Sequence, residues 1–285
     1  MIKIQKIGNV TKFRLARTLF GRGLYFTAAY LLDGLLVDTG CAYTVTELTA
    51  ALQDLEVHTV INTHSHEDHV AANAALQKCF GARVLAHPDA LPFLANPRKV
   101  RLRPYQLVMW GYPEPSTGDP VGEFLETDNC RFHIIHTPGH SPDHICLFDP
   151  QERRLFTGDA YVGGRDRALR LDYNIWEIVR SLKKMAALEP RVIFAGSGTV
   201  KDDARQELAG KIDYLEDIGG RVLDLHRKGW SRRRIRLELL GKEMSIAYYT
   251  LGHFSGKNLV RSFIEDYTDA PGGTISYTRD RPRSN

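Results

Sequence analysis

Histidines and carboxylates gather in one short stretch of the chain, residues 63–70, which reads THSHEDHV. His64 and His66 are two positions apart, so in an extended backbone both imidazoles point to the same side. Asp68 continues that alternation, and His69 follows it directly. Imidazole and carboxylate groups together suit zinc, iron or manganese. The spacing therefore predicts a metal site.

Two further pieces of sequence carry the same kinds of side chain. In residues 136–144, HTPGHSPDH, a tight Pro-Gly turn precedes His140 and can direct it into the same cleft. A Thr-Gly-Asp run ends at Asp159, and its glycine allows a close approach of the backbone to a ligand. His133, His136 and His144 are each interpreted as packed or surface histidines. The predicted metal ligands are His64, His66, Asp68, His69, His140 and Asp159.

These motifs resemble those of the metallo-β-lactamase superfamily. The resemblance rests on HSHEDH at 64–69, on the turn before His140, on the TGD run, and on Asp38 in LLVDTG. It covers about residues 20–198, and its motifs are nearer to the glyoxalase II and lactonase branches than to the true β-lactamases. It implies an α/β fold, an αββα sandwich of two mixed sheets flanked by helices, with the site at one edge.

The resemblance also implies which side chain holds which ion. His64, His66 and His140 would bind a first ion, Asp68 and His69 a second, and Asp159 both. A hydroxide shared by the ions would then attack a carbonyl or phosphoryl centre. The expected cofactor is a divalent metal, one or two ions per chain, with zinc the first expectation and iron or manganese the alternatives.

The turn at residues 195–198, AGSG, departs from the family pattern. Ser197 stands where the family has a histidine ligand, and a neutral hydroxyl is a poor ligand for these ions. Water could fill the position, or another residue such as His253 could reach it. As a third alternative the site holds one ion. Asp68 is then the expected catalytic residue, a general base beside the bound water.

The elements that position these residues follow from hydrophobic periodicity. Strands are predicted at 25–38 (a hairpin), 59–62, 83–86, 131–136, 144–149, 154–158 and 191–195, and helices at 44–55, 70–80 and 174–188. Beyond residue 198 the pattern becomes helical, without an obvious strand. We therefore expect a metallo-β-lactamase-like core at 1–198 and a helical C-terminal extension, 199–285, that packs on it.

Composition narrows the classes of partner. A hydrophobic content of 43% and a charged content of 25% are typical of a globular protein, and a net charge of +4 is too small to indicate nucleic-acid binding. No segment approaches the roughly 20 apolar residues of a membrane span. With four scattered cysteines and no signal-like start, the sequence predicts a cytoplasmic protein with a small-molecule substrate. The oligomeric state stays open, with a homodimer as one option.

The substrate is less determined than the metal. The irregular segment 98–124 and the arginines of 161–173 could cover the cleft, and arginines there could bind a carboxylate or phosphate. The leading hypothesis is a hydrolase that cleaves an ester-type bond, a thioester or a lactone. The alternatives are a mononuclear iron enzyme similar to persulfide dioxygenases and a non-catalytic member that binds metal and a ligand.

Overall fold

The computed structural model describes residues 1–267, and internal contacts divide the chain into two compact units. The core unit consists of residues 1–165 and 180–214, and the helical unit consists of residues 166–179 and the chain from 215 onward. Helices α5 (Ile175–Ala187) and α6 (Ala204–Arg227) each contribute to both units. The predicted domain division at residue 198 stays a prediction.

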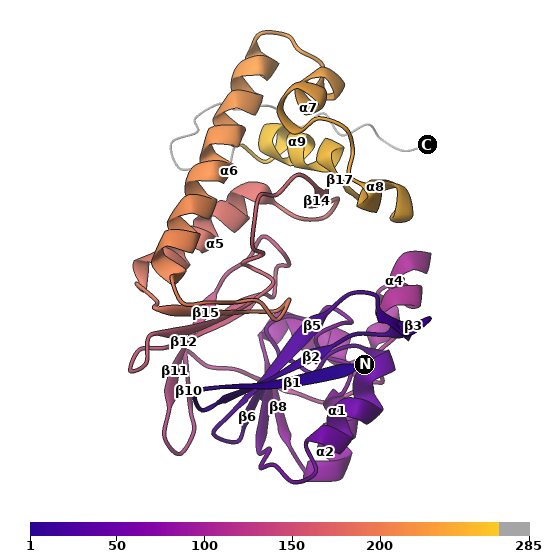
Figure 1. The fold of residues 1–285 in the computed structure, drawn as a ribbon, viewed down its shortest axis with the longest axis vertical. Helices are drawn as coiled ribbons and strands as arrows, with labels where there is room; N and C mark the ends of the chain where they lie inside the picture. The colour runs from indigo at the N-terminus through magenta and orange to yellow at the C-terminus, as the bar shows by residue number, and fades with distance from the viewer. Residues whose placement is uncertain (268–285) are drawn as a thin grey trace. The chain divides into compact units, whose positions relative to one another are not determined.

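The core unit contains two mixed sheets (Figure 1). The first has the strand order β1-β2-β5-β6-β7-β8-β9, in which β6, β7, β8 and β9 run parallel. Its strands are β1 (Ile2–Ile7), β2 (Val10–Leu15), β5 (Thr27–Leu32), β6 (Leu35–Val37), β7 (Thr59–Ile61), β8 (Arg83–Ala86) and β9 (Asp119–Pro120). A separate small hairpin is formed by β3 (Thr18–Leu19) and β4 (Arg22–Gly23).

The second sheet has the order β10-β11-β12-β13-β15-β16, and only β13 and β15 in it are parallel. Its strands are β10 (Phe124–Glu126), β11 (Arg131–His136), β12 (Ile145–Asp149), β13 (Arg154–Gly158), β15 (Val192–Ala195) and β16 (Val200–Lys201). The remaining helices of the core unit are α1 (Val45–Ala51), α2 (Asn73–Phe80), α3 (Leu91–Ala95), α4 (Pro104–Met109) and the three-residue 3-10 turns η1 (Ala42–Thr44), η2 (Pro88–Ala90) and η3 (Pro97–Lys99).

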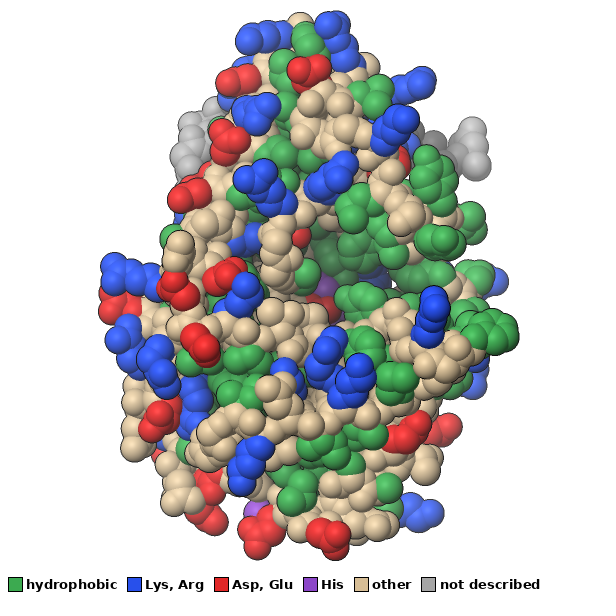
Figure 2. Space-filling model, viewed as in Figure 1, with side chains coloured by type: hydrophobic (Ala, Val, Ile, Leu, Met, Phe, Trp, Pro, Cys, Tyr) green, Lys and Arg blue, Asp and Glu red, His purple; other side chains and the backbone are tan. Residues whose placement is uncertain are grey.

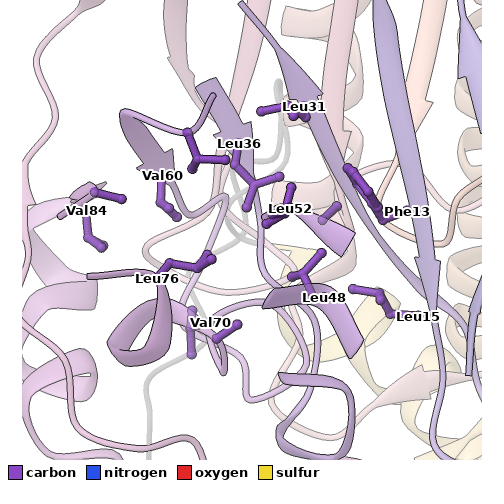
Figure 3. Packing of buried hydrophobic residues seen from close by; sticks show 14 of the residues in the cluster. Phe13, Leu15, Leu31, Leu36, Leu48, Leu52, Val60, Val70, Leu76 and Val84 are labelled. Atoms are coloured by element: carbon purple, nitrogen blue, oxygen red, sulfur yellow. The ribbon is translucent and has the colours of Figure 1, made fainter. Parts of the chain in front are cut away.

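Two apolar layers hold these elements together. Between the sheets, Tyr30 and Ile61 of the first sheet pack in one cluster with Phe156 of the second. Outside the first sheet a second cluster lies under α1 and α2, where helix residues meet strand residues (Figure 3). Its labelled members are Phe13, Leu15, Leu31, Leu36, Leu48, Leu52, Val60, Val70, Leu76 and Val84. On the second sheet, Met185 of α5 contacts Cys146 of β12 at 3.5 Å. The predicted αββα sandwich is confirmed.

Local sequence accounts for most of these elements. The strands predicted at 83–86, 131–136 and 154–158 have those bounds in the structure. The hairpin β1–β2 was not predicted, because half of the side chains of β1 are polar and most are exposed. Two short strands, β16 and β17 (Phe254–Ser255), correct the expectation that no strand follows residue 198. The segment predicted to be irregular, 98–124, contains α4 and β9.

The helical unit is built around β14 (Leu169–Arg170), which pairs with β17, and three helices, α7 (Arg232–Leu240), α8 (Ser245–Tyr249) and α9 (Gly256–Glu265). Helices α7 and α9 begin at serine caps, since Ser231 accepts from the amide of Arg234 and Ser255 from that of Asn258. The helical pattern expected beyond residue 198 is thereby observed in α7 and α9. Among residues 1–267, no helix is long and apolar enough to cross a membrane. Basic, acidic and hydrophobic side chains are interspersed on the face shown in Figure 2.

Candidate metal centre

The centre is assembled at the ends of parallel strands of the core unit. Asp38 follows β6, and residues 62–72 follow β7, so both segments leave the first sheet at the same edge. Asp38 is buried and has a positive φ of 60°, which aspartate tolerates better than most residues. Its carboxylate accepts three hydrogen bonds of 2.8 Å, two from the amide and hydroxyl of Thr63 and one from His69 Nδ1. Asp38 therefore holds this loop in place.

The same bonds determine which imidazole nitrogens face the centre. The Thr63 hydroxyl donates to Asp38, so its oxygen is left to accept from His64 Nδ1, 3.0 Å away. His64 Nε2 then keeps its lone pair. His69 is oriented in the same way, since Nδ1 donates to Asp38 and Nε2 points away from it. A carboxylate or hydroxyl behind an imidazole is the usual support of a metal-binding histidine.

Three histidines converge on one point. His66 Nδ1 lies 2.9 Å from His64 Nε2 and 2.9 Å from His140 Nε2. Two of the three come from the loop after β7, and His140 comes from the turn between β11 and β12. Zn–N bonds are about 2.0–2.1 Å long, so nitrogens at this separation fit ligands of a single ion.

The carboxylates lie next to the histidines. Asp159, directly after β13, places Oδ2 at 3.7 Å from His140 Nε2 and Oδ1 at 3.6 Å from His69 Nε2. Asp68 Oδ2 is 3.8 Å from the same His69 nitrogen. The structure thus brings all six predicted ligands together. Five of them form two overlapping groups that could hold an ion, His64–His66–His140 and His64–His69–Asp159, and Asp68 belongs to neither group.

One buried atom tests whether a cation fits. His69 Nε2 is buried and makes no hydrogen bond, although Asp68 and Asp159 direct oxygens towards it. A buried imidazole nitrogen without a partner is costly, and a cation between it and the two carboxylates would satisfy all three groups. The donor set of neutral imidazoles and carboxylates also fits a divalent ion.

Charge and burial shift the pKa values of these groups. Burial lowers the pKa of His64, and the neighbouring histidines lower it further, so its imidazole is neutral and able to accept a cation. Burial raises the pKa of Asp68 to about 7 against the opposing effect of His69. For His69 burial favours the neutral form, but Asp38, Asp159 and Asp68 raise its pKa well above the usual value. Burial would raise the pKa of Asp159, yet the facing histidines hold it below its ordinary value.

Sequence reasoning assigned no role to two residues that shape the centre. His144, interpreted as packed or surface, is buried; its Nε2 accepts from the amide of Asp159 at 3.2 Å and its Nδ1 donates to the Thr137 hydroxyl at 2.9 Å. Asp143 accepts from the amide of Ser65 at 2.8 Å. The signal in the sequence was their position three and four residues after His140, within the same HTPGHSPDH motif.

Two glycines let the backbone pass close to the ligands. A Cβ at Gly158, which has φ of 46°, would lie 2.6 Å from Thr63 Oγ1 and 2.8 Å from His144 Nε2. A Cβ at Gly196 would lie 2.4 Å from Asp159 Oδ1 and 3.0 Å from His69 Cε1. The turn after β15 therefore contacts the carboxylate–histidine side of the centre directly.

Ser197, which stands where the family pattern has a histidine, makes its side-chain hydrogen bond within its own turn. The Ser197 hydroxyl donates to Thr199 Oγ1 at 3.1 Å within its own turn. His253, the candidate substitute, belongs to the helical unit, where its Nε2 lies 3.7 Å from Asp172 Oδ1. Among the described residues, neither group of side chains able to hold an ion includes His253.

Three aromatic rings pack in a row, Tyr25 from the loop before β5 and Tyr105 and Trp110 from α4 and its C-terminal end. Tyr25 packs edge-on against Trp110 with ring centroids 5.6 Å apart, and Trp110 packs in the same manner against Tyr105. Desolvation of its hydroxyl end raises the pKa of Tyr25, although 45% of the residue is exposed, and the charges of Asp159 and Asp68 raise that pKa further. The phenol is therefore neutral, and it lies close enough to the centre for the carboxylates there to shift its pKa. Tyr25 was missed in the sequence because it lies outside every motif.

The sequence profile of the Metallo-beta-lactamase superfamily matches residues 22–197, which include every residue of the centre. The chain belongs to this superfamily. The matched range ends at Ser197, within the turn that contacts Asp159.

Individual relatives of this metallo-β-lactamase superfamily chain cover part of it. It is 27% identical over 175 residues, 61% of this chain, to an atrochrysone carboxyl ACP thioesterase of Aspergillus fumigatus. It is 30% identical over 155 residues to a hydroxyacylglutathione hydrolase of Haemophilus influenzae, which covers 51% of this chain and 71% of that protein. The chain spans about half the length, 49%, of the Aspergillus relative.

Solved structures show the same fold. A metallo-beta-lactamase family protein of Thermus thermophilus superposes with a TM-score of 0.66 at 22% identity, covering 92% of this chain and 94% of that one. A metallo-beta-lactamase from Pontibacter korlensis gives a TM-score of 0.59 at 17% identity over 76% of this chain. At these identities the likeness concerns the fold alone.

Proposed function

We propose that this superfamily member is a metal-dependent hydrolase that cleaves a thioester. The observation that carries the proposal is the convergence of His64, His66 and His140 with the Asp159 carboxylate at one edge of the sandwich. The choice of a thioester over a lactone is supported by the two relatives described above, which are a thioesterase and a hydroxyacylglutathione hydrolase.

Different residues of the chain would bind the cation and orient the residues that bind it. One cation would be held by His64, His66 and His140. A second cation would be held, more weakly, by Asp68, His69 and Asp159. When bound, such a cation supplies an activated water at neutral pH and polarises the carbonyl group under attack. Asp38 keeps the Nε2 atoms of His64 and His69 directed inward through Thr63 and by direct contact.

When the centre holds one ion, bound by the three-histidine group, Asp68 is the proposed general base. In the cation-free centre its pKa of about 7 allows it to accept a proton near neutral pH. It is buried, and its only described ion-pair partner in residues 1–267 is His69 Nε2. The proton lost by the attacking water can therefore pass to Asp68 Oδ2 without reaching bulk solvent.

The test is hydrolysis of an acyl thioester by protein purified with its native metal, before and after chelation. We expect turnover, loss of turnover on metal removal, and recovery when zinc, iron or manganese is returned. The oxygen ester of the same acyl group serves as the comparison substrate. Turnover that persists after complete metal removal would refute the proposal, as would hydrolysis that Asp68→Asn leaves unchanged.

A further inference from the structure

Two basic side chains of β2 are held between the sheets without an acidic partner. Lys12 is 7% exposed, and Arg14 is partly buried. They are two residues apart on one strand, so both lie on the face of β2 opposite the core residues Phe13 and Leu15. Within residues 1–267, neither is part of an ion pair, which is unusual because buried charges are ordinarily paired.

The surroundings of the two cations are apolar or already basic. The Arg14 guanidinium lies 4.5 Å from the ring centroid of Phe26, and Lys3 Nζ lies 5.4 Å from the same ring. Lys3 is also the direct partner of Arg14 in the pairing of β1 with β2. Burial lowers the pKa of Lys12, and the positive charge of Arg14 lowers it further. The aromatic face compensates one charge in part, but the group keeps a net positive charge.

The hydrogen-bonding capacity of Lys12 and Arg14 is also incompletely used. Arg14 Nε is buried and has no hydrogen-bond partner in the described part of the chain. Lys12 Nζ donates to the carbonyl oxygen of Gly198 at 3.1 Å, which leaves two of its three donors. A guanidinium fork beside an ammonium group is a donor set that suits a carboxylate or a phosphate.

The two cations lie against the turn that borders the metal centre. A Cβ at Gly198 would come within 2.9 Å of Arg14 Cγ and 3.0 Å of Arg14 Nε, so only glycine allows this contact. Two residues earlier, Gly196 contacts Asp159 and His69. The turn is fixed to the first sheet by the Ala28 amide, which donates to Gly196 O at 2.7 Å, and by the Tyr30 hydroxyl, which donates to Ala195 O at 2.6 Å. The turn thus contacts both the cations and the proposed ligands.

We propose that Lys12 and Arg14, with the turn at residues 196–198, form a binding site for an anionic group, a carboxylate or a phosphate, on the substrate. This part of the inference rests on the proposed hydrolase function. An anion there supplies the missing counter-charge, and it fixes one end of the substrate while the ester carbon lies at the metal centre. Binding energy is then gained away from the bond that is cleaved.

The first experiment measures anion binding without turnover. The metal-loaded protein is melted in about 20 mM inorganic phosphate and in chloride of equal ionic strength. We expect phosphate to raise the Tm of the wild type by roughly 2–4 °C, to raise that of Arg14→Gln much less, and to act fully on Lys6→Gln. Lys6 is an exposed lysine on β1, so this control removes the same charge elsewhere. Phosphate bound at the metal centre would act equally on all three proteins.

The second experiment identifies the source of the anionic group. Four thioesters of equal length are compared, in which the acyl part and the thiol part each end in a carboxylate or a carboxamide. We expect the wild type to favour one carboxylate position by about tenfold in KM, and Arg14→Gln to remove that preference with little change in kcat. If Arg14→Gln does not fold, Arg14→Lys keeps the charge without the fork and should retain only part of the preference.

The outcomes separate this site from the proposed function. If phosphate stabilises the wild type and Arg14→Gln equally, the anion site is wrong even when thioesters are hydrolysed. If phosphate acts through Arg14 but no carboxylate preference exists, the site binds a free anion and its assignment to the substrate is wrong. If no thioester is hydrolysed while the Arg14-dependent stabilisation persists, the hydrolase proposal fails and the anion site stands.

Discussion

The two sides of the metal centre differ in their donors. On one side, His64, His66 and His140 offer three imidazole nitrogens. On the other, His69 faces two carboxylates, Asp68 and Asp159, and its Nε2 lacks a hydrogen bond. The first side thus has three nitrogen ligands for one ion without a further residue. The second side ends at Ser197, whose hydroxyl bonds within its own turn.

The difference predicts that cations bound on the two sides would be held with unequal affinity. A complete set of neutral imidazoles binds a divalent ion by direct coordination. The carboxylate side attracts a cation strongly by charge but supplies fewer well-placed donors, so its affinity depends on how firmly His69 is oriented. Asp38 provides that orientation from behind. The predictions below separate the two sides, beginning with the largest effect.

Removing one imidazole from the three-histidine group should abolish the centre. For His66→Ala we expect loss of the tightly held cation and a fall in thioester turnover of more than about 100-fold, because this histidine lies between the other two. Elemental analysis and steady-state kinetics measure the two effects. His133→Ala, which changes a histidine of β11 that belongs to neither ligand group, is the control. Full metal content in His66→Ala would show that this side does not hold the ion.

Removing the support behind both sides should weaken them without removing a ligand. Asp38→Asn can still accept from the Thr63 amide but no longer favours a donating His69 Nδ1. We expect metal affinity to fall by about 10–100-fold. Competition with a chelator of known affinity measures it.

The matched control is Asp143→Asn, which changes a carboxylate whose hydrogen bond to the loop, within residues 1–267, is to the Ser65 amide. Its effect should be clearly smaller. Equal losses in the two variants would mean that Asp38 stabilises the loop and does not orient His69.

Supplying an imidazole at residue 197 should make the two sides more alike. Ser197→His restores the ligand type that the family pattern places in this turn, beside Gly196 and its contact with Asp159. We expect the metal content to rise by as much as one ion per chain, as measured by elemental analysis after dialysis. Ser197→Ala should leave the metal content unchanged, since the hydroxyl bonds to Thr199. A rise in Ser197→Ala, or none in Ser197→His, would contradict the assignment of this turn to the second side.

The sequence predicted the members of both sides because the ligands lie in short motifs at strand ends. Spacing alone placed His64, His66 and Asp68 together, and apolar strands such as β8 have clear bounds. It did not predict the supports. The roles of Asp38 and His144 depend on contacts between segments far apart in the chain.

The hairpin β1–β2 shows the same limit for the fold. The alternation of its IKIQKI strand breaks at Gln5-Lys6, and even Ile4 is exposed, so the strand marks no buried face. Sequence analysis assigned no role to Lys12 and Arg14, whereas pairing with β5 turns one face of β2 towards the space between the sheets. That the six ligands bind metal stays a prediction until an ion is measured.

The last prediction concerns folding stability instead of metal binding, and the residue that positions Asp159. Burial lowers the pKa of His144 to about 4, from an ordinary value of 6.5. Between these values the unfolded chain binds a proton that the folded protein does not, so stability is lost as the pH falls from 6.5 to 4. The contribution of a neutral His144, complete above pH 6.5, amounts to roughly 3 kcal/mol.

Urea unfolding at several pH values measures this loss. Many groups titrate in the same range, so the informative quantity is the free energy of unfolding of the wild type minus that of His144→Gln. Glutamine keeps an acceptor for the Asp159 amide but does not titrate. The difference should decline by about 3 kcal/mol from pH 7 to pH 4. A difference that is constant with pH would show that His144 is not held neutral, and that the Asp159 backbone is positioned by other contacts.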